Sequence, residues 1–322
     1  MKGSLRAAFA ALATVVATLV QAQPFPHKTV TLVVPYAPGG LPDTVARVVG
    51  QKLSDKWGQA VVIENKPGGN GVVAAQYLST KPADGYVLLV TDATMFTVNP
   101  FIYANLPYDP VKDFTPMSFT ARAPLFLAVA PSLPANNFAE FVTMVKATPA
   151  KYTYGSSGIG SIHHLTFESI KAALGLDILH VPFKGTGQSI PALVSGQVTA
   201  VWSAIPSISG FVKEGKLKLI AVNSEKRSKL APDVATVAET LIPGFDFAPI
   251  IGFSGPAGVP AAIAAKVAAD VADVLKDPAL AERLTVLGID PVGEGPKEYA
   301  AQLASDRARM QVAVKLAGAK AD

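Results

Sequence analysis

Three segments of the chain place glycines and hydroxyl side chains directly before a predicted helix, at residues 36–43, 155–161 and 183–189. Glycine allows a ligand to approach the backbone closely. The first N–H groups of a helix have no partner within the helix and carry partial positive charge. Such a junction binds anions, so three of them at equivalent places predict a site for a negatively charged ligand.

The candidate ligand contacts come from all three junctions. They are Tyr36, Ala37, Pro38, Gly39, Gly40, Leu41 and Asp43 in the first, Ser156, Ser157, Gly158, Gly160 and Ser161 in the second, and Lys184, Gly185 and Thr186 in the third, with Thr94 after another strand. For Asp43 we favour a structural role in the first helical turn over a ligand contact. Lys184 either neutralises an anion or is an ordinary solvated lysine. The glycines could equally serve only to make tight turns.

The sequence gives little support for catalysis or metal binding. The chain has no cysteine, and the second junction departs from a nucleophile elbow because Ile159 stands where the motif needs glycine. His163 and His164 are adjacent, so they point about 100° apart on a helix and cannot jointly bind one metal. We expect no enzyme activity, no cofactor and no metal. The alternative is a secreted serine hydrolase acting on carboxylate esters, with Ser156 or Ser157 beside a base.

The junctions are positioned by predicted strands and helices that alternate along the chain. Strands are predicted at residues 29–36, 60–64, 86–90, 125–130, 152–155, 178–182, 198–203, 217–222 and 245–253, and helices at 42–57, 71–80, 138–147, 161–174, 188–195, 260–275 and 297–316. The β-α-β order predicts parallel sheets covered by helices. It restarts near residue 125, so we expect two similar α/β units, with the chain crossing between them near residues 125 and 220.

Composition and the first residues narrow the class of protein. Of the 322 residues 50% are hydrophobic and 16% charged, which excludes a disordered chain. Lys2 and Arg6 precede an apolar run, and small residues follow it, so residues 1–22 are predicted to be a signal peptide rather than a membrane anchor. Without this segment the net charge falls from +4 to +2. Basic residues do not cluster with aromatic ones, so we expect no nucleic-acid partner and a location in a bacterial periplasm.

Several motifs resemble the Bug-type substrate-binding proteins of tripartite tricarboxylate transporters. They occur in the family's order over nearly the whole chain after residue 22. They are VPYAPGG at 34–40 followed by Asp43, VIENKPGG at 62–69, ADGYVLL at 83–89, LPYDP at 106–110, YGSSGIGS at 154–161 followed by His163, VPFKGTG at 181–187 and GFSGPAGVP at 252–260. Because the motifs are long and keep their order, the resemblance is specific.

The resemblance implies an α/β, two-lobed periplasmic binding protein fold of the flytrap type, with mostly parallel sheets and helices on both faces. It implies lobes formed by residues 23–124 with 224–322 and by residues 125–223. The ligand would be a carboxylate held by residues 38–43 and 156–161, often through ordered water, with His163 among the contacts. Members hand the ligand to a separate membrane permease, and we expect a monomer. A periplasmic sensor, whose closed form docks on a receptor, remains an alternative.

One residue departs from the family pattern. Ser203 stands at a strand end where members often carry an acidic residue, and it is retained as a candidate contact. The loss of that acid argues against an amino acid as the ligand. We therefore favour a mono- or dicarboxylate with an apolar or aromatic body. Trp202, beside it, is expected in the core.

Overall fold

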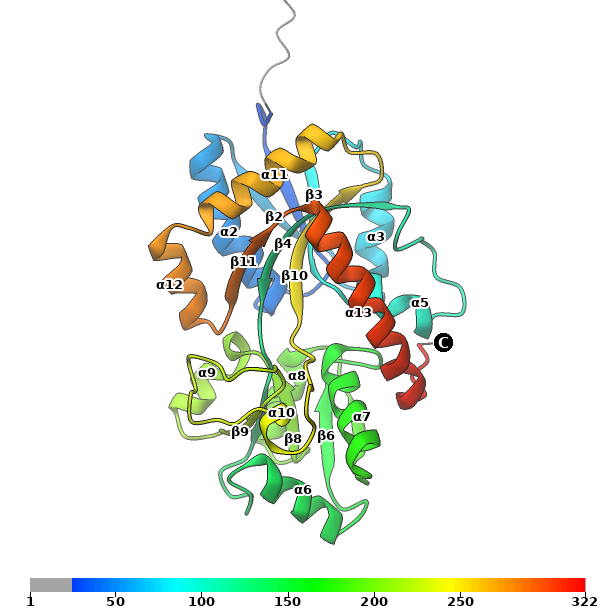
Figure 1. Cartoon of the computed structure of the whole chain (residues 1–322), viewed down its shortest axis with the longest axis vertical. Helices are drawn as coiled ribbons and strands as arrows, with labels where there is room; N and C mark the ends of the chain where they lie inside the picture. Colours follow the sequence, from blue (N-terminus) through cyan, green and yellow to red (C-terminus); the bar gives the residue numbers. More distant parts are fainter. Residues whose placement is uncertain (1–24, 322) are drawn as a thin grey trace, which may run out of the picture.

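The computed structural model describes residues 25–321, so the predicted signal peptide lies outside the described part of the chain. The described chain forms two lobes, one above the other along the long axis of the molecule (Figure 1). Each lobe contains one β-sheet with helices on both faces. Among residues 25–321, none of the helices combines the length and the apolar character that a bilayer-spanning segment requires.

The first lobe is built on six strands in the order β11-β4-β10-β3-β1-β2. These are β1 (Val30–Val34), β2 (Val61–Asn65), β3 (Val87–Asp92), β4 (Phe114–Arg122), β10 (Ile250–Pro256) and β11 (Asp290–Glu294). The helices are α2 (Leu41–Trp57), η1 (Gly69–Gly71), α3 (Val72–Ser79), α4 (Thr94–Thr97), α5 (Asn99–Ile102), α11 (Ala261–Val274), α12 (Pro278–Val286) and α13 (Pro296–Ala317). β1 buries both faces: Val30 and Leu32 pack towards α2 and α11, and Val33 packs towards α3 and α13.

The second lobe is built on five strands in the order β7-β6-β8-β5-β9. These are β5 (Phe126–Val129), β6 (Thr153–Ser156), β7 (Leu179–Pro182), β8 (Ala200–Ser203) and β9 (Lys218–Val222). The helices are α6 (Phe138–Ala147), α7 (Ile162–Leu174), α8 (Thr186–Val194), α9 (Ile205–Lys213) and α10 (Val237–Thr240). Trp202 is fully buried on the α6–α7 side of this sheet, which confirms its predicted place in the core.

Both sheets are mixed, whereas the sequence predicted mostly parallel ones. β1 pairs in parallel with β2 and β3, and β6 with β7 and β8. β10 runs antiparallel between β3 and β4, and β5 runs antiparallel between β8 and β9. Each of these two strands is the first after the chain has crossed from the other lobe. A crossing strand enters the new sheet from the hinge side, and this reverses its direction.

The second crossing lies later than the sequence predicted. Val237, Phe245 and Phe247 belong to the hydrophobic cluster of the second lobe, and Thr236 forms a β-bridge with Val222 at the end of β9. The sequence-based division gives residues 224–249 to the first lobe, but their apolar side chains pack on the second. We therefore propose residues 123–125 and 248–249 as the two crossing segments.

Asn223 joins both crossing segments at the hinge. Its Oδ1 accepts a hydrogen bond from the Leu125 amide at 2.7 Å, and its Nδ2 donates to the Phe247 carbonyl at 2.8 Å. Its backbone N–H donates to the Leu125 carbonyl, and its carbonyl accepts from the Phe247 amide. The residue is completely buried. One side chain therefore satisfies polar groups of both connections between the lobes.

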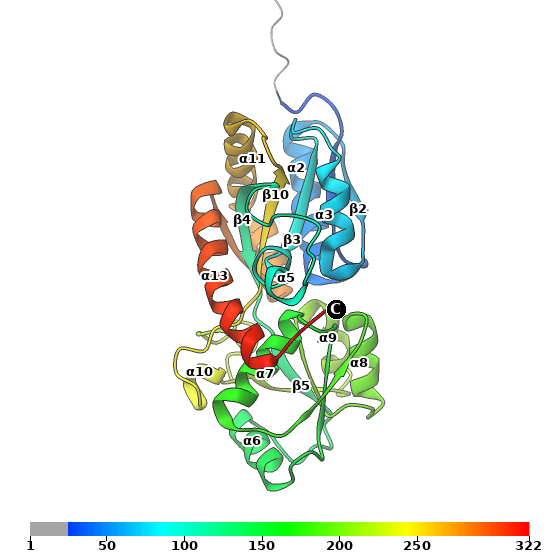
Figure 2. The ribbon, with the colours of Figure 1, turned by 90° about the vertical axis from the view of Figure 1, so that its right-hand side faces the viewer.

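Helix α13 provides a third connection. Figure 2 shows it running along the first lobe and reaching α7 of the second. Tyr299 and Leu303, in its first half, pack in the first lobe, whereas Met310 and Val314 belong to the core cluster of the second. Beyond the helix, the Ala321 amide donates to the Ile102 carbonyl at the end of α5. The C-terminal residues therefore contact both lobes.

Candidate ligand-binding site

The directions of the strands turn the predicted junctions of the two lobes towards each other. β3 and β4 are both antiparallel to β10, so they run the same way, and β4 ends where the chain leaves for the second lobe. The carboxyl ends of β1, β2 and β3 therefore face the second lobe. β8 is antiparallel to β5, which starts at the hinge, so the carboxyl ends of β6, β7 and β8 face the first lobe. Ligands of open α/β sheets bind beyond such strand ends.

The first junction, at the start of α2, is organised by Asp43. Its Oδ2 accepts from the Gly39 amide at 2.9 Å and from Arg47 Nε at 2.9 Å, and its Oδ1 accepts from Arg47 Nη2 and Asn65 Nδ2. Burial acts to raise the pKa of Asp43, but the hydrogen bonds from Arg47, Gly39 and Asn65 outweigh it and lower the pKa. Asp43 is 2% exposed, and these donors surround its carboxylate. Asp43 therefore holds the loop in place, in agreement with the structural role favoured from the sequence.

The groups left for a ligand in this junction are backbone groups. The first intrahelical bond of α2 runs from the Thr44 amide to the Gly40 carbonyl, so the amides of Gly40 and Leu41 precede the helical ladder. Ala37, Pro38 and Gly39 are exposed. Leu41 is partly buried and packs against core clusters of both lobes, so it lies at the lobe boundary.

The second junction, at the start of α7, is held by three histidines. Ser156 Oγ lies 2.7 Å from His180 Nε2, and Ser157 Oγ bonds His163 Nδ1. The Gly160 amide donates to His164 Nδ1 at 3.1 Å. Each imidazole therefore fixes a different point of residues 156–160, which we call the second junction loop. His163 contacts this loop and does so through Ser157.

Around this loop, Ser161 caps α7. Its Oγ accepts from the His164 amide and donates to the Gly158 carbonyl at 2.7 Å. Ser156 is completely buried. Among the described residues, no carboxylate hydrogen-bonds His180, and no group of three residues could hold a metal ion. The Ser156–His180 pair therefore lacks both access and the third group that orients a catalytic base.

Burial keeps these imidazoles neutral. It lowers the pKa of His163 to about 4, and burial together with the neighbouring His164 lowers the pKa of His180 to about 4. Burial also lowers the pKa of His164. The rings of His164 and His180 stack with their centroids 4.1 Å apart. Two stacked rings cannot both take up a proton without strong repulsion.

We expect the protein to lose stability as the pH falls from about 6.5 to about 4. The ordinary pKa of histidine is about 6.5, so the unfolded chain binds protons in this range that the folded His163 and His180 do not. A depressed histidine pKa therefore stabilises the fold fully above pH 6.5, and that contribution disappears on acidification. Urea unfolding at pH 7, 6 and 5 measures it. At pH 5, His163 and His180 together should account for nearly two protons taken up on unfolding, and His164 should add to them.

His180→Gln should remove about one of these protons. A flat stability curve between pH 6.5 and 5 in the wild type would contradict the role given to the imidazoles.

The third junction, at the start of α8, places its charged side chain in solvent. Lys184 is exposed, and its amide donates to Gln188 Oε1 at 3.1 Å. Gly185 precedes α8 with a φ of +128°, and Thr186 Oγ1 lies 3.5 Å from Ser207 Oγ of α9. Ser203 is completely buried, and its hydroxyl donates to the Ala204 carbonyl. The exposed Lys184 has the solvated position that was the alternative prediction.

The lobes touch on both sides of the facing strand ends. The second junction loop meets the first lobe, where Asn70 Nδ2 donates to the Ile159 carbonyl at 3.2 Å. A Cβ placed on Gly160, whose φ is +76°, would lie 2.5 Å from Ile102 Cδ1. On the other side, α2 contacts α9. The two junctions therefore lie on opposed surfaces of one lobe boundary.

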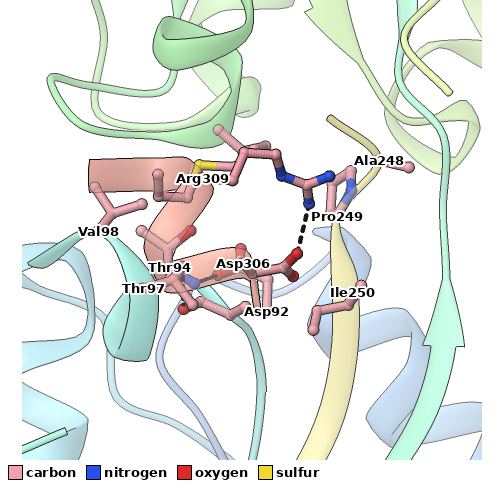
Figure 3. Close-up of a pocket in the computed structure, with 12 residues that line it drawn as sticks. Asp92, Thr94, Thr97, Val98, Ala248, Pro249, Ile250, Asp306 and Arg309 are labelled. Carbon is pink, nitrogen blue, oxygen red and sulfur yellow. Dashed lines mark hydrogen bonds and ion pairs between the residues drawn. The ribbon is translucent and has the colours of Figure 1, made fainter. Parts of the chain in front are cut away.

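A cavity of about 20 Å³ lies at this boundary next to the hinge (Figure 3). Its lining includes Asp92 and Thr94 at the end of β3, Ile162 at the start of α7, and Asp306 and Arg309 of α13. Of these, only Thr94 was predicted. Asp92 ends the buried strand β3, and a polar residue at a strand end is the one sequence signal that could have identified it. Residues 306 and 309 are too distant in sequence to be assigned to this place.

Comparison with known proteins assigns the chain to a family. Residues 45–318 match the model of the tripartite tricarboxylate transporter family receptor. A UPF0065 protein of Bordetella pertussis is 34% identical over 85% of this chain and 85% of its own length.

Two solved structures share the two-lobed fold. R. palustris Rpa4515 with adipate has a TM-score of 0.87 and 32% identity, covering 92% of this chain and 99% of that one. The periplasmic binding protein BugD has a TM-score of 0.83 and 30% identity over the same shares. These likenesses confirm the predicted periplasmic binding protein fold. The chain is a solute-binding receptor, and it belongs to the receptor family of the tripartite tricarboxylate transporters.

Proposed function

We propose that the protein captures an organic carboxylate in the periplasm and delivers it to the permease of a tripartite tricarboxylate transporter. One observation supports this most: the N-termini of α2 and α7 lie on opposed surfaces of the two lobes, each preceded by a glycine-bearing loop. Partial positive charges from both helices then act on one ligand. The relative Rpa4515, with the same fold, has adipate bound.

Binding requires no side-chain cation at the anchor. Arg47, an arginine beside the first junction, hydrogen-bonds Asp43 twice. The amides of Gly40 and Leu41, and those near Ser161, supply donors without a compensating charge of their own. A carboxylate suits such donors because it accepts several hydrogen bonds at once. We further propose that residues 1–22 direct export, that the protein acts as a monomer, and that the candidate contacts near Gly40 and Ser161 hold the ligand.

A thermal-shift panel tests the binding function. Mono-, di- and tricarboxylates with aliphatic or aromatic bodies are each paired with the corresponding amide, such as adipate with adipamide and benzoate with benzamide. A bound carboxylate should raise the melting temperature by several degrees, because ligand at 100 times its Kd stabilises by about 2.7 kcal/mol. The uncharged amides should have no effect.

Mass spectrometry of the complex then separates binding from hydrolysis. An intact ligand recovered after incubation agrees with a receptor. Turnover of carboxylate esters that Ser156→Ala abolishes would support the hydrolase instead, and a panel in which no carboxylate raises the melting temperature would rule out the proposed function.

A further inference from the structure

Asp92 has a buried carboxyl group that pairs with no cation of the described chain. Its Oδ1 accepts hydrogen bonds from the Tyr36 hydroxyl at 2.9 Å and from the Thr94 amide at 2.9 Å. Both donors are neutral groups, and no ion pair among residues 25–321 includes Asp92. Asp43, the other acid near the first junction, differs because Arg47 pairs with it.

A cationic side chain lines the same cavity as Asp92, but it is already paired with another carboxylate. Arg309 lines the same cavity, but its guanidinium pairs with Asp306, as Figure 3 shows. Asp306 is 4% exposed and also accepts a hydrogen bond from Gln302. The Asp306–Arg309 pair is neutral as a unit. The remaining ionisable groups beside Asp92 are the phenols of Tyr36 and Tyr299, and burial raises the pKa of each, so they stay neutral. Asp92 is therefore the carboxyl group of this cavity that has no cationic partner.

Ionisation of Asp92 is costly when no cation is present. Burial raises the pKa of Asp92, and hydrogen bonds from Thr94 and Tyr36 only partly oppose that rise. A cation entering the cavity would offset the cost of burial, whereas a second anion would increase it. Binding should therefore depend on the charge of the ligand group that reaches Asp92.

The cavity has the size of one small polar group. Its volume of about 20 Å³ exceeds the 10–15 Å³ that one water molecule needs. An ammonium group is close to water in size. The cavity is connected to both junctions: Ile162, which follows the second junction, lines it, and Asp92, which also lines it, accepts a hydrogen bond from Tyr36 of the first. A ligand whose carboxylate lies between the junctions can therefore place another group beside Asp92.

We propose that Asp92 determines specificity by binding a protonated amine of the ligand, so that the protein prefers an amino-carboxylate to a dicarboxylate of the same length. This inference rests on the proposed function, because it presumes that a carboxylate is held between the junctions. It revises the expectation that the serine at position 203 argues against an amino acid. An acid is present at the lobe boundary, at the end of β3 rather than β8.

Isothermal titration with matched ligands tests the inference. Each set holds the carbon skeleton constant: 4-aminobutyrate with succinate, 6-aminohexanoate with adipate, and 4-(aminomethyl)benzoate with terephthalate. In the wild type, the amino-carboxylate of at least one set should bind about tenfold or more tightly than its dicarboxylate, a difference of about 1.4 kcal/mol. No dicarboxylate should bind more tightly than its amino partner.

Asp92→Asn is the decisive variant. Asparagine keeps an oxygen that accepts from Tyr36 and Thr94 but removes the charge, so the preference should fall to about one or reverse. Asp290→Asn is the control, because it removes the same charge from an exposed position of the same lobe. The Asp290→Asn variant should prefer amino-carboxylates over dicarboxylates as strongly as the wild type does.

The outcomes separate the two proposals. If no carboxylate of the broad panel binds, the proposed function itself fails. If carboxylates bind but no set shows the amine preference in the wild type, the assignment of Asp92 is overturned and the receptor function stands. The same holds if Asp92→Asn keeps the full preference. Should Asp92→Asn not fold, the wild-type ratios alone decide.

Discussion

Replacing Gly160 with alanine is expected to weaken ligand binding by roughly 10- to 100-fold while the protein stays folded. The added Cβ would lie 2.5 Å from Ile102 Cδ1, which belongs to the other lobe. Overpacking of this kind costs about 1–3 kcal/mol, which corresponds to that loss of affinity. Separation of the lobes relieves the clash. The facing helix N-termini then no longer act together on one ligand, so the effect falls on binding.

Two further variants distinguish this cause from backbone strain. Gly175, at the other end of α7, also has a left-handed φ, of +62°, but a Cβ there meets nothing within 4 Å. Gly175→Ala should therefore bind as the wild type does. Adding Ile102→Ala to Gly160→Ala removes the obstructing side chain and should restore most of the affinity. The affinity of each variant is measured by titration with a carboxylate that the panel identifies. Wild-type affinity in Gly160→Ala would refute the opposed-lobe site.

Replacing Asn223 with alanine is expected to lower the free energy of unfolding by about 2–4 kcal/mol. The substitution leaves the buried Leu125 amide and Phe247 carbonyl without their side-chain partners. An unsatisfied buried polar group costs about 1–3 kcal/mol, and here there are two. Some of this cost disappears if water enters the site, which sets the lower end of the range.

Urea unfolding followed by circular dichroism measures this loss. Asn105, which is exposed in the first lobe, provides the control, and Asn105→Ala should change stability by less than about 0.5 kcal/mol. An Asn223→Ala protein as stable as the control would show that the backbone hydrogen bonds hold the two crossings without the side chain.

The elements that carry the junctions could be predicted closely from the sequence. α2 and α7 start within one residue of their predicted starts, because a glycine and proline run, or a capping serine, fixes a helix start locally. β4 was missed, since Pro116 and the buried Ser118 and Thr120 break its apolar pattern. Its polar side chains are buried by contacts that form only after the chain has returned from the second lobe.

The pairing of charged groups at the site could not be predicted, because it depends on residues that are far apart in the chain. Asp43 could be given a structural role from its own helix, because Arg47 stands four residues later. Asp92 could not be judged in that way, since its isolation depends on whether Arg309 pairs with it or with Asp306. The roles of the histidines could not be predicted either, because His164 of α7 stacks on His180 of β7. Local sequence patterns thus predicted where the loops lie, whereas tertiary contacts determine which charged groups around them are paired.

The crossing of the chain at residues 248–249 also bears on the order of folding. Every strand of the second sheet lies between residues 126 and 222, so that sheet can assemble as soon as this stretch has been synthesised. The first sheet lacks β10 until later, and β10 stands between β3 and β4. A nascent chain therefore exposes one edge of β3 and leaves β4 without either neighbour, and such edges are open to aggregation. We expect insertion of β10 to be the slow step of maturation.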